Sequence, residues 1–303
     1  MGSCSWSNDE FKTYSKSMSR GVGDDGTVLL SAHTKATQLY TATSLDPMLN
    51  PKGVIRECKD CEAHPQSIPV ILALDVTGSM GRTAVEVSKN LGVIMTELCK
   101  LSPNVEFMIM GIGDFAYDEA PLQVSQFEAD VRIAEQLDKL YFEGGGGPNP
   151  FESYSAAWMF AANQTSLDCW SRGKKGIIIT IGDEILNPHI DRERYYRVTE
   201  CLGDNRQNRD LYIYTEDIYN MVKDKYDLYH IDINHYSNER SERNRESFAQ
   251  VIGNENVSVC TVEQATQKIV AIISEYIYKE DGIYEVPVAE STVETDENGF
   301  ISW

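Results

Sequence analysis

An acidic side chain and two hydroxyls occur together in the stretch LALDVTGSMG at positions 72–81. Asp75 follows an apolar run, and Thr77 and Ser79 come two and four residues after it. A carboxylate in this position can act as a nucleophile, anchor a cofactor or bind a metal ion. The two hydroxyls favour a metal ion, because hard divalent cations such as Mg²⁺ prefer oxygen ligands.

Two further acids follow apolar runs that are typical of buried strands. Asp114 comes after VEFMIMGIG (105–113), and Asp183 lies in KKGIIITIGDE (174–184). In an open parallel sheet, ligands bind at the carboxyl ends of strands where the strand order reverses. We therefore expect Asp75 and Asp183 to meet at one edge of a sheet. Asp114 is interpreted as a turn residue near that edge.

The elements that position these residues alternate between strands and helices. Strands are predicted at 68–74, 105–113, 121–127, 174–184, 226–233 and 257–262. Helices are predicted at 83–100 and 130–140, from about 151, and at 190–202, 216–225, 241–252 and 263–278. The aromatic stripe of Phe151, Tyr154 and Trp158 is interpreted as core packing.

This alternation predicts an α/β fold. We expect an open, doubly wound, mainly parallel six-stranded sheet with one antiparallel edge strand, at 121–127, and helices on both faces. The domain spans residues 68–278. Residues 1–67 form a polar, partly ordered N-terminal arm, and residues 279–303 form an acidic C-terminal segment.

The motif resembles the metal-ion-dependent adhesion site (MIDAS) of von Willebrand factor A (VWA) domains. That family's pattern is Asp-x-Ser-x-Ser with Thr as a frequent variant, which Asp75, Thr77 and Ser79 match, and Asp183 matches its second aspartate. The resemblance implies a Rossmann-like fold and a bound Mg²⁺, or Mn²⁺ or Ca²⁺. It also implies an open coordination position that the Asp or Glu of a protein partner fills.

The chain departs from the family pattern at the third anchor of the metal. The family has a Thr in the loop after the third strand and its helix, whereas GGGGPNPFESY (144–154) contains none. Asn149 is the oxygen donor predicted to take this place, and Glu152 lies one short step beyond it. The glycines lack the Gly-Lys-Ser/Thr of a phosphate-binding loop, which disfavours a nucleotide site.

The charge of the chain limits its partners. Among 303 residues, 27 are Lys or Arg and 47 are Asp or Glu, so the formal net charge is −20. Such a chain repels nucleic acids and anionic membranes. No apolar run approaches the roughly 20 residues that span a bilayer, and the N-terminus resembles no secretory signal. We expect a cytoplasmic protein within a larger assembly.

The cysteines do not suggest a framework of disulfide bonds. Seven are scattered along the chain and are interpreted as mostly reduced thiols. Cys58, Cys61 and His64 in ECKDCEAH have a spacing seen in zinc sites, but no second Cys-x-x-Cys completes four ligands. A solvated loop is the preferred interpretation.

The sequence therefore favours a non-enzymatic, metal-dependent protein–protein interaction module. One alternative is a structural subunit of a larger particle with a vestigial metal site. Another is a Mg²⁺-dependent phosphohydrolase of the haloacid-dehalogenase type with Asp75 as nucleophile. The second alternative is disfavoured, because that family needs an Asp as general acid where this chain has Thr77.

Overall fold

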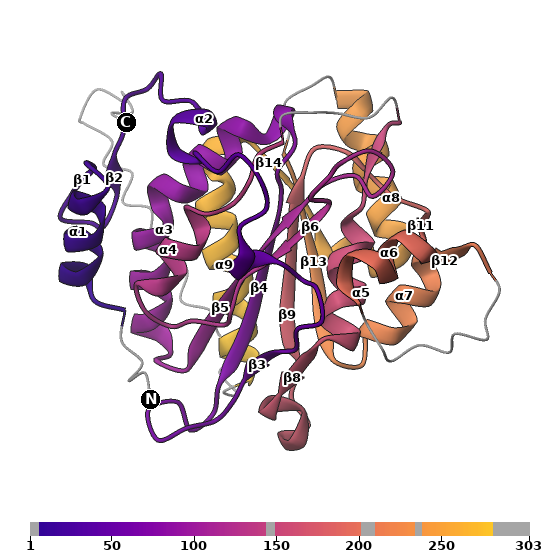
Figure 1. The fold of residues 1–303 in the computed structure, drawn as a ribbon. Helices are drawn as coiled ribbons and strands as arrows, with labels where there is room; N and C mark the ends of the chain where they lie inside the picture. The colour runs from indigo at the N-terminus through magenta and orange to yellow at the C-terminus, as the bar shows by residue number, and fades with distance from the viewer. Residues whose placement is uncertain (1–5, 144–148, 201–209, 234–237, 281–303) are drawn as a thin grey trace, which may run out of the picture.

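The central strands of the sheet consist of continuous apolar runs, as expected of parallel strands covered on both faces. The computed structural model describes residues 6–143, 149–200, 210–233 and 238–280 (Figure 1). Six strands form the main sheet in this part of the chain. They are β4 (Ile68–Asp75), β5 (Val105–Ile112), β6 (Leu122–Val124), β9 (Gly176–Gly182), β13 (Tyr226–Ile233) and β14 (Val257–Cys260).

The order of the strands across the sheet is β14-β13-β9-β4-β5-β6. All neighbours pair in parallel except β6, which runs antiparallel to β5. The chain moves outward from β4 to β5 and β6, then returns to β9 on the other side of β4. The direction of winding therefore reverses between β4 and β9. The predicted six-stranded, mainly parallel sheet with an antiparallel edge strand is confirmed.

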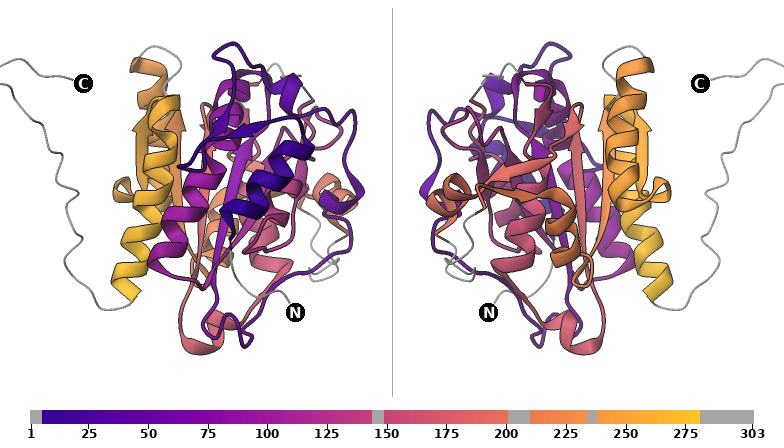
Figure 2. Two further views of the ribbon diagram at one scale, coloured as in Figure 1. Left: turned by 90° about the vertical axis from the view of Figure 1, so that its left-hand side faces the viewer. Right: turned by 90° about the vertical axis from the view of Figure 1, so that its right-hand side faces the viewer.

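Helices pack on both faces of the sheet (Figure 2). One face carries α3 (Gly81–Leu101), α4 (Arg132–Leu137) and α9 (Ala265–Glu280). The other face carries α5 (Tyr154–Asn163), α7 (Thr215–Val222) and α8 (Asn238–Ile252), with α6 (Arg192–Thr199) beside them. Helices α3 and α9 lie against each other, as do α5 and α7. The described part of the chain therefore has a mixed α/β architecture, with a mostly parallel sheet between two layers of helices.

Short strand pairs outside the main sheet link distant loops. They are β3 (Arg56–Cys58) with β8 (Thr165–Leu167), β7 (Phe151–Glu152) with β10 (Ile185–Leu186), and β11 (His189–Asp191) with β12 (Tyr212–Tyr214). The β7–β10 pair places the segment after the glycine-rich loop directly beside the segment that follows Asp183. These pairings join residues far apart in sequence, so local patterns did not predict them.

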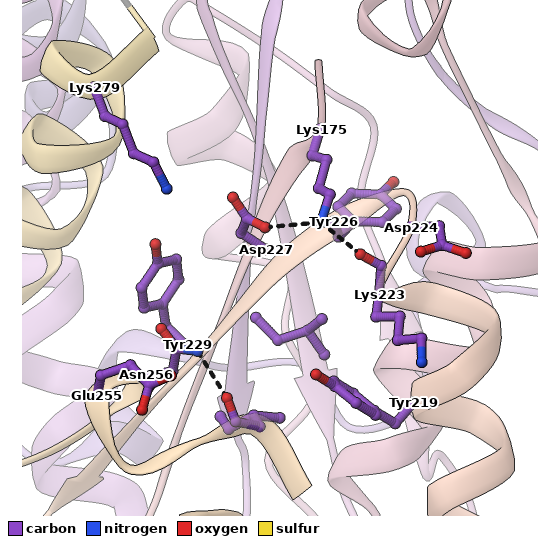
Figure 3. A pocket seen from close by; sticks show the side chains of 12 residues that line it. Lys175, Tyr219, Lys223, Asp224, Tyr226, Asp227, Tyr229, Glu255, Asn256 and Lys279 are labelled. Carbon is purple, nitrogen blue, oxygen red and sulfur yellow. Dashed lines mark hydrogen bonds and ion pairs between the residues drawn. The ribbon is translucent and has the colours of Figure 1, made fainter. Parts of the chain in front are cut away.

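A cavity of about 420 Å³ lies where β9 and β13 begin, opposite to the edge where β4 ends (Figure 3). The Lys175 ammonium donates to the Lys223 carbonyl, at 2.8 Å, and to the carboxylate of Asp227, at 3.2 Å. Lys279 reaches toward this cavity from α9. Because this lining lies at the beginning of the strands, the cavity is separate from the predicted metal edge.

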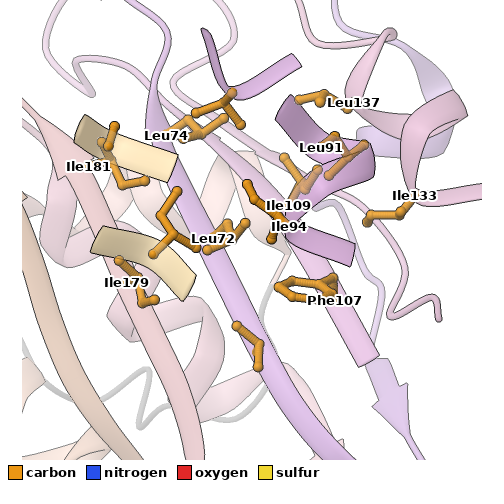
Figure 4. Close-up of a cluster of buried hydrophobic side chains, with 14 of the residues drawn as sticks. Leu72, Leu74, Leu91, Ile94, Phe107, Ile109, Ile133, Leu137, Ile179 and Ile181 are labelled. Atoms are coloured by element: carbon orange, nitrogen blue, oxygen red, sulfur yellow. The ribbon is translucent and has the colours of Figure 1, made fainter. Parts of the chain in front are cut away.

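The hydrophobic core fixes the position of β4. Leu72 and Leu74 point toward α3, where they pack with Leu91 and Ile94 (Figure 4). The alternate residues of β4 face the opposite helices and belong to the second core cluster. Each fully buried aliphatic side chain contributes about 1.5–3 kcal/mol to stability. Burial on both faces therefore holds the carboxyl end of β4 in place.

The segment before β4 packs against α3 and α4. It contains α1 (Asn8–Ser17), a hairpin of β1 (Gly21–Val22) and β2 (Val28–Leu29), and α2 (Ala36–Leu39). Phe11 joins the core cluster on the α3 side of the sheet. The Tyr14 hydroxyl donates to Asp138 at 2.6 Å, and the Arg20 guanidinium donates to the same carboxylate at 2.8 Å. A side-chain network thus attaches this segment to the end of α4.

No helix within the described ranges is long and apolar enough to cross a membrane. The acidic segment predicted from residue 279 begins in the last turn of α9, and its residues 281–303 lie outside the described part of the chain.

A buried histidine lies beneath the edge where β9 and β13 end. His230 is fully buried, its ring stacks on Phe248 with centroids 3.4 Å apart, and its Nδ1 is 3.0 Å from the Thr180 hydroxyl. Burial lowers the pKa of His230 from 6.5 to about 3. The folded protein therefore keeps this imidazole neutral at pH values where the unfolded chain protonates it.

We predict that this histidine makes the protein less stable in acid. A lowered native pKa gives stability that is complete above pH 6.5 and is lost as the pH falls toward 3. Between pH 7.5 and pH 5 the loss amounts to about 2 kcal/mol. The free energy of unfolding is measured in urea for wild type and His230→Gln at both pH values. Between pH 7.5 and pH 5 it should fall by about 2 kcal/mol less in the variant than in wild type. Equal pH dependence in the two proteins would contradict the assignment.

Candidate metal-ion site

The two aspartates of the predicted site lie at the ends of neighbouring strands. Asp75 is the last residue of β4, and Asp183 directly follows β9. Since β4 and β9 flank the point where the winding reverses, this is the edge at which open α/β sheets bind ligands. The fold thus brings together two acids that are 108 positions apart in the sequence.

The Asp75 carboxylate is buried and fully supplied with hydrogen-bond donors. Its Oδ1 accepts from the backbone nitrogen of Thr77 at 2.8 Å and from the Thr77 hydroxyl at 2.6 Å. Its Oδ2 accepts from the hydroxyl of Tyr154 at 2.9 Å. Burial, with a further contribution from the charge of Asp183, raises the pKa of Asp75 to about 7, although the hydrogen bonds from Thr77 and Tyr154 oppose the rise. A cation at this edge would stabilise the ionised form.

Ser79 joins the motif to the second aspartate. Its hydroxyl donates to Asp183 Oδ1 at 3.0 Å, and Ser79 is exposed while Asp183 is completely buried. Two neighbouring ligands of an octahedral Mg²⁺, each about 2.1 Å from the ion, lie roughly 3.0 Å apart. The Ser79–Asp183 spacing fits this arrangement. The exposure of Ser79 leaves the site open toward solvent.

Tyr154 reaches Asp75 because Gly182 carries no side chain. A Cβ at Gly182 would lie 1.8 Å from the Tyr154 hydroxyl oxygen. The Tyr154 ring is buried edge-on to His230 and Phe248. The sequence predicted Tyr154 as a core residue, and its contact with Asp75 is an additional role that the helical pattern did not reveal.

Asn149, the predicted third anchor, lies beside a different acid. Its side-chain nitrogen donates to Asp114 Oδ2 at 2.6 Å. Asp114 is buried in the loop after β5, where its Oδ1 accepts from the backbone nitrogen of Ala116 at 2.6 Å. Asp114 therefore acts in a turn, as the sequence suggested. Residues 144–148 of the glycine-rich loop lie outside the described residues.

Glu152, which the sequence places one short step beyond the predicted third anchor, is a further acid near the site. It lies in β7, paired with the strand that follows Asp183, and is 6% exposed. Its Oε2 has no hydrogen-bond partner among the described residues. Burial raises the pKa of Glu152 to about 10, and the negative charges of Asp75 and Asp114 contribute to the rise. A cation at the strand ends would reduce this repulsion.

The opposite wall of the site is formed by α8. The side-chain nitrogen of Asn244 donates to the backbone oxygen of Asp183 at 2.7 Å and to Asp232 Oδ1 at 3.2 Å. The hydroxyl of Ser241 donates to the other oxygen of Asp232. These contacts attach the first half of α8 to the ends of β9 and β13.

The donor set fits a hard divalent cation. Asp75, Thr77, Ser79 and Asp183 offer only oxygen atoms, which suits Mg²⁺, Mn²⁺ or Ca²⁺ rather than a thiophilic metal. In the described part of the chain, no three His, Cys, Asp or Glu side chains form a ready-made metal cluster. Two carboxylates and two hydroxyls therefore make up the candidate site.

The Cys58 region forms no cluster of this kind either. Cys58 is buried, Cys61 is exposed, and both are free thiols, as are the other cysteines that the structure describes. The Nδ1 atom of buried His64 lies 4.0 Å from Glu106 Oε1.

No family model and no curated protein sequence matches this chain. A structure of the pilus adhesin SpaC from Lactobacillus rhamnosus GG, in an open conformation, is similar at 16% identity and a TM-score of 0.46. The match covers 76% of this chain and 31% of SpaC, so this chain spans about a third of that protein's length.

Two further solved structures are similar to this chain. One is the vWF domain of the type V pili tip protein Mfa5 from Porphyromonas gingivalis, with 11% identity, a TM-score of 0.45, and coverage of 73% of this chain and 98% of that chain. The other is proximal thread matrix protein 1 from the mussel byssus, with 9% identity, a TM-score of 0.43, and coverage of 72% and 48%.

The cytoplasmic location predicted from the sequence is contradicted by these comparisons, because the similar structures include a pilus adhesin and a pilus tip protein. The prediction rested on an N-terminus without an apolar segment and on scattered cysteines. Neither feature determines where a folded α/β domain acts.

We predict that removal of the Tyr154 hydroxyl destabilises the protein through Asp75. Tyr154→Phe leaves a buried, charged acceptor without one donor, which costs about 1.5–3 kcal/mol. Because this donor favours the ionised carboxylate, the loss should be larger at pH 8 than at pH 6 in urea unfolding.

Tyr219→Phe is the matched control, since the hydroxyl of Tyr219 has no hydrogen-bond partner within the described ranges and its loss should cost less than about 0.5 kcal/mol. Equal effects of the two substitutions, or an effect of Tyr154→Phe that is independent of pH, would show that the contact with Asp75 contributes nothing specific.

Proposed function

We propose that this chain is a VWA-type, non-enzymatic protein interaction module with a MIDAS-like site. Its residues hold a divalent cation, Mg²⁺ or alternatively Mn²⁺ or Ca²⁺, and the cation binds an Asp or Glu of a protein partner. The observation that carries the proposal is the 3.0 Å contact between Ser79 and Asp183. It joins the Asp-x-Thr-x-Ser motif to the second acid at the edge where the sheet winding reverses.

Each residue of the site has a distinct part in this proposal. The hydroxyl oxygens of Thr77 and Ser79 are candidate ligands, and Asp75 and Asp183 supply the negative charge that attracts the cation. Tyr154 orients Asp75 through its 2.9 Å hydrogen bond. Bound there, the cation would supply a Lewis-acidic position for an incoming carboxylate. The exposed side of Ser79 is where a partner reaches the site.

The surroundings of Asp75 support a binding role rather than nucleophilic catalysis. A nucleophilic carboxylate must present an oxygen to its substrate, but Asp75 is 1% exposed and both of its oxygens accept hydrogen bonds. Thr77 occupies the position of the general acid in a phosphohydrolase. Its hydroxyl donates a hydrogen bond to Asp75. An alcohol is a poor general acid near neutral pH.

We predict that divalent cations stabilise the fold through Asp183. With a dissociation constant of about 0.5 mM, 5 mM Mg²⁺ would add about 1.4 kcal/mol by mass action. For a chain of this size, that corresponds to an increase in Tm of roughly 2–4 °C. Asp183→Asn should abolish the increment in a calorimetric melt, even if the variant's own Tm changes.

Asp224→Asn is the matched control, because Asp224 is exposed at the distant cavity and its loss should leave the increment intact. A wild-type Tm that stays constant in 10 mM Mg²⁺, Mn²⁺ and Ca²⁺ would overturn the metal site and favour the structural-subunit interpretation.

A further inference from the structure

A pocket of about 320 Å³ borders the candidate metal site on the side of α8. Its lining includes Pro150, Glu184 and the two arginines Arg240 and Arg243. Glu184 directly follows Asp183, and Asn244, which also lines the pocket, donates to the backbone oxygen of Asp183. The pocket and the candidate metal site therefore share a wall.

The two arginines differ in how their charges are balanced. Arg240 forms an ion pair with Glu184. Arg243 is exposed, and within the described ranges its guanidinium has neither an ion-pair nor a hydrogen-bond partner. The pocket thus presents one uncompensated positive charge in a chain whose formal net charge is −20. Near a site proposed to attract an acidic partner, this charge favours an anionic ligand.

The backbone that carries Arg243 is held firmly. Ser241 and Asn244, on either side of it in α8, both donate to the carboxylate of Asp232 at the end of β13. Asn244 is 2% exposed and also holds the backbone of Asp183. The base of the arginine side chain therefore has a fixed position relative to the strand ends, which reduces the entropy lost on binding.

We propose that this pocket binds a second carboxylate of the partner through Arg243. The occupant is an acidic peptide segment with two carboxylates, one at the metal site and one at the guanidinium. This proposal rests on the proposed function, since it assigns the first carboxylate to the metal. It adds a specificity-determining residue and states the chemistry of the partner.

A carboxylate suits the pocket better than a phosphate or a nucleic acid does. The planar guanidinium matches a carboxylate through two parallel hydrogen bonds. A phosphate group carries nearly two negative charges and is bound in proteins by clusters of arginines, whereas Arg240 is neutralised by Glu184. The overall charge of −20 also opposes polyanions.

The test uses synthetic heptapeptides of Gly and Ser that carry either one Glu or two Glu separated by one, two or three residues. Each fluorescent peptide is titrated with the full chain in 5 mM Mg²⁺ and in EDTA, and binding is followed by anisotropy. In Mg²⁺ the best two-Glu peptide should bind wild type about five- to tenfold more tightly than the one-Glu peptide.

Arg243→Ala should remove this advantage and leave the affinity for the one-Glu peptide unchanged. Arg245→Ala is the matched control on the same helix, because Arg245 contacts Asn254 and does not line the pocket. Both variants should keep the Mg²⁺-dependent increase in Tm, which shows that the fold and the metal site are intact.

The outcomes separate this proposal from the proposed function. Suppose that the one-Glu peptide binds only in Mg²⁺. If a second Glu then gives no advantage, or if Arg243→Ala preserves the advantage, the pocket assignment is wrong and the metal site stands. If the two-Glu peptide needs Arg243 but binds equally in EDTA, the metal bridge is wrong and the pocket stands. If no peptide binds under either condition, both are overturned.

Discussion

The burial of the Asp75 carboxylate at the end of β4 is the constraint on which the rest of the site depends. An ionised carboxylate that is 1% exposed is costly unless donors surround it. Thr77 supplies two donors from the same motif, but the third comes from Tyr154, on a helix across the sheet. Tyr154 fits only because Gly182 has no Cβ, and its ring packs against His230. The geometry of the short motif therefore depends on this core.

The distribution of charge is compatible with the proposed binding of an acidic partner by this acidic protein. The net charge of −20 repels anions at long range, but salt screens this repulsion beyond about 8 Å at physiological ionic strength. Close to the strand ends, burial and, after it, the repulsion between neighbouring acids raise the pKa values of Asp75 and Glu152, and a bound cation would relieve the repulsion. The proposed cation and Arg243 would offset this negative charge locally. In the proposed binding mode, affinity would depend on contact at these two points, because the net charge of −20 disfavours acidic ligands elsewhere.

Local patterns predicted the six strands of the main sheet and most of the helices, because continuous apolar runs and helical periods are visible within a short window. They missed α1, in which only Phe11 and Ser15 are buried and the apolar stripe is weak. They predicted that Asp75 and Asp183 meet, since both follow buried strands. They could not reveal that Tyr154 donates to Asp75 or that Asn149 donates to Asp114, because these contacts depend on loop paths and on side chains far apart in sequence.

Asp183 contacts both proposed binding points, the metal motif and the helix α8 that carries Arg243, through different atoms. Its Oδ1 accepts from Ser79, which belongs to the metal motif, and its backbone oxygen accepts from Asn244 of α8. The helix that carries Arg243 cannot shift along the strand ends without breaking the second of these hydrogen bonds. The span between the metal position and the base of Arg243 is therefore set by the backbone of one residue. In the proposed binding mode, a partner would have to match that span with the separation of its two carboxylates. Asp183, which belongs to the proposed metal site, would thereby also limit which acidic segments bind.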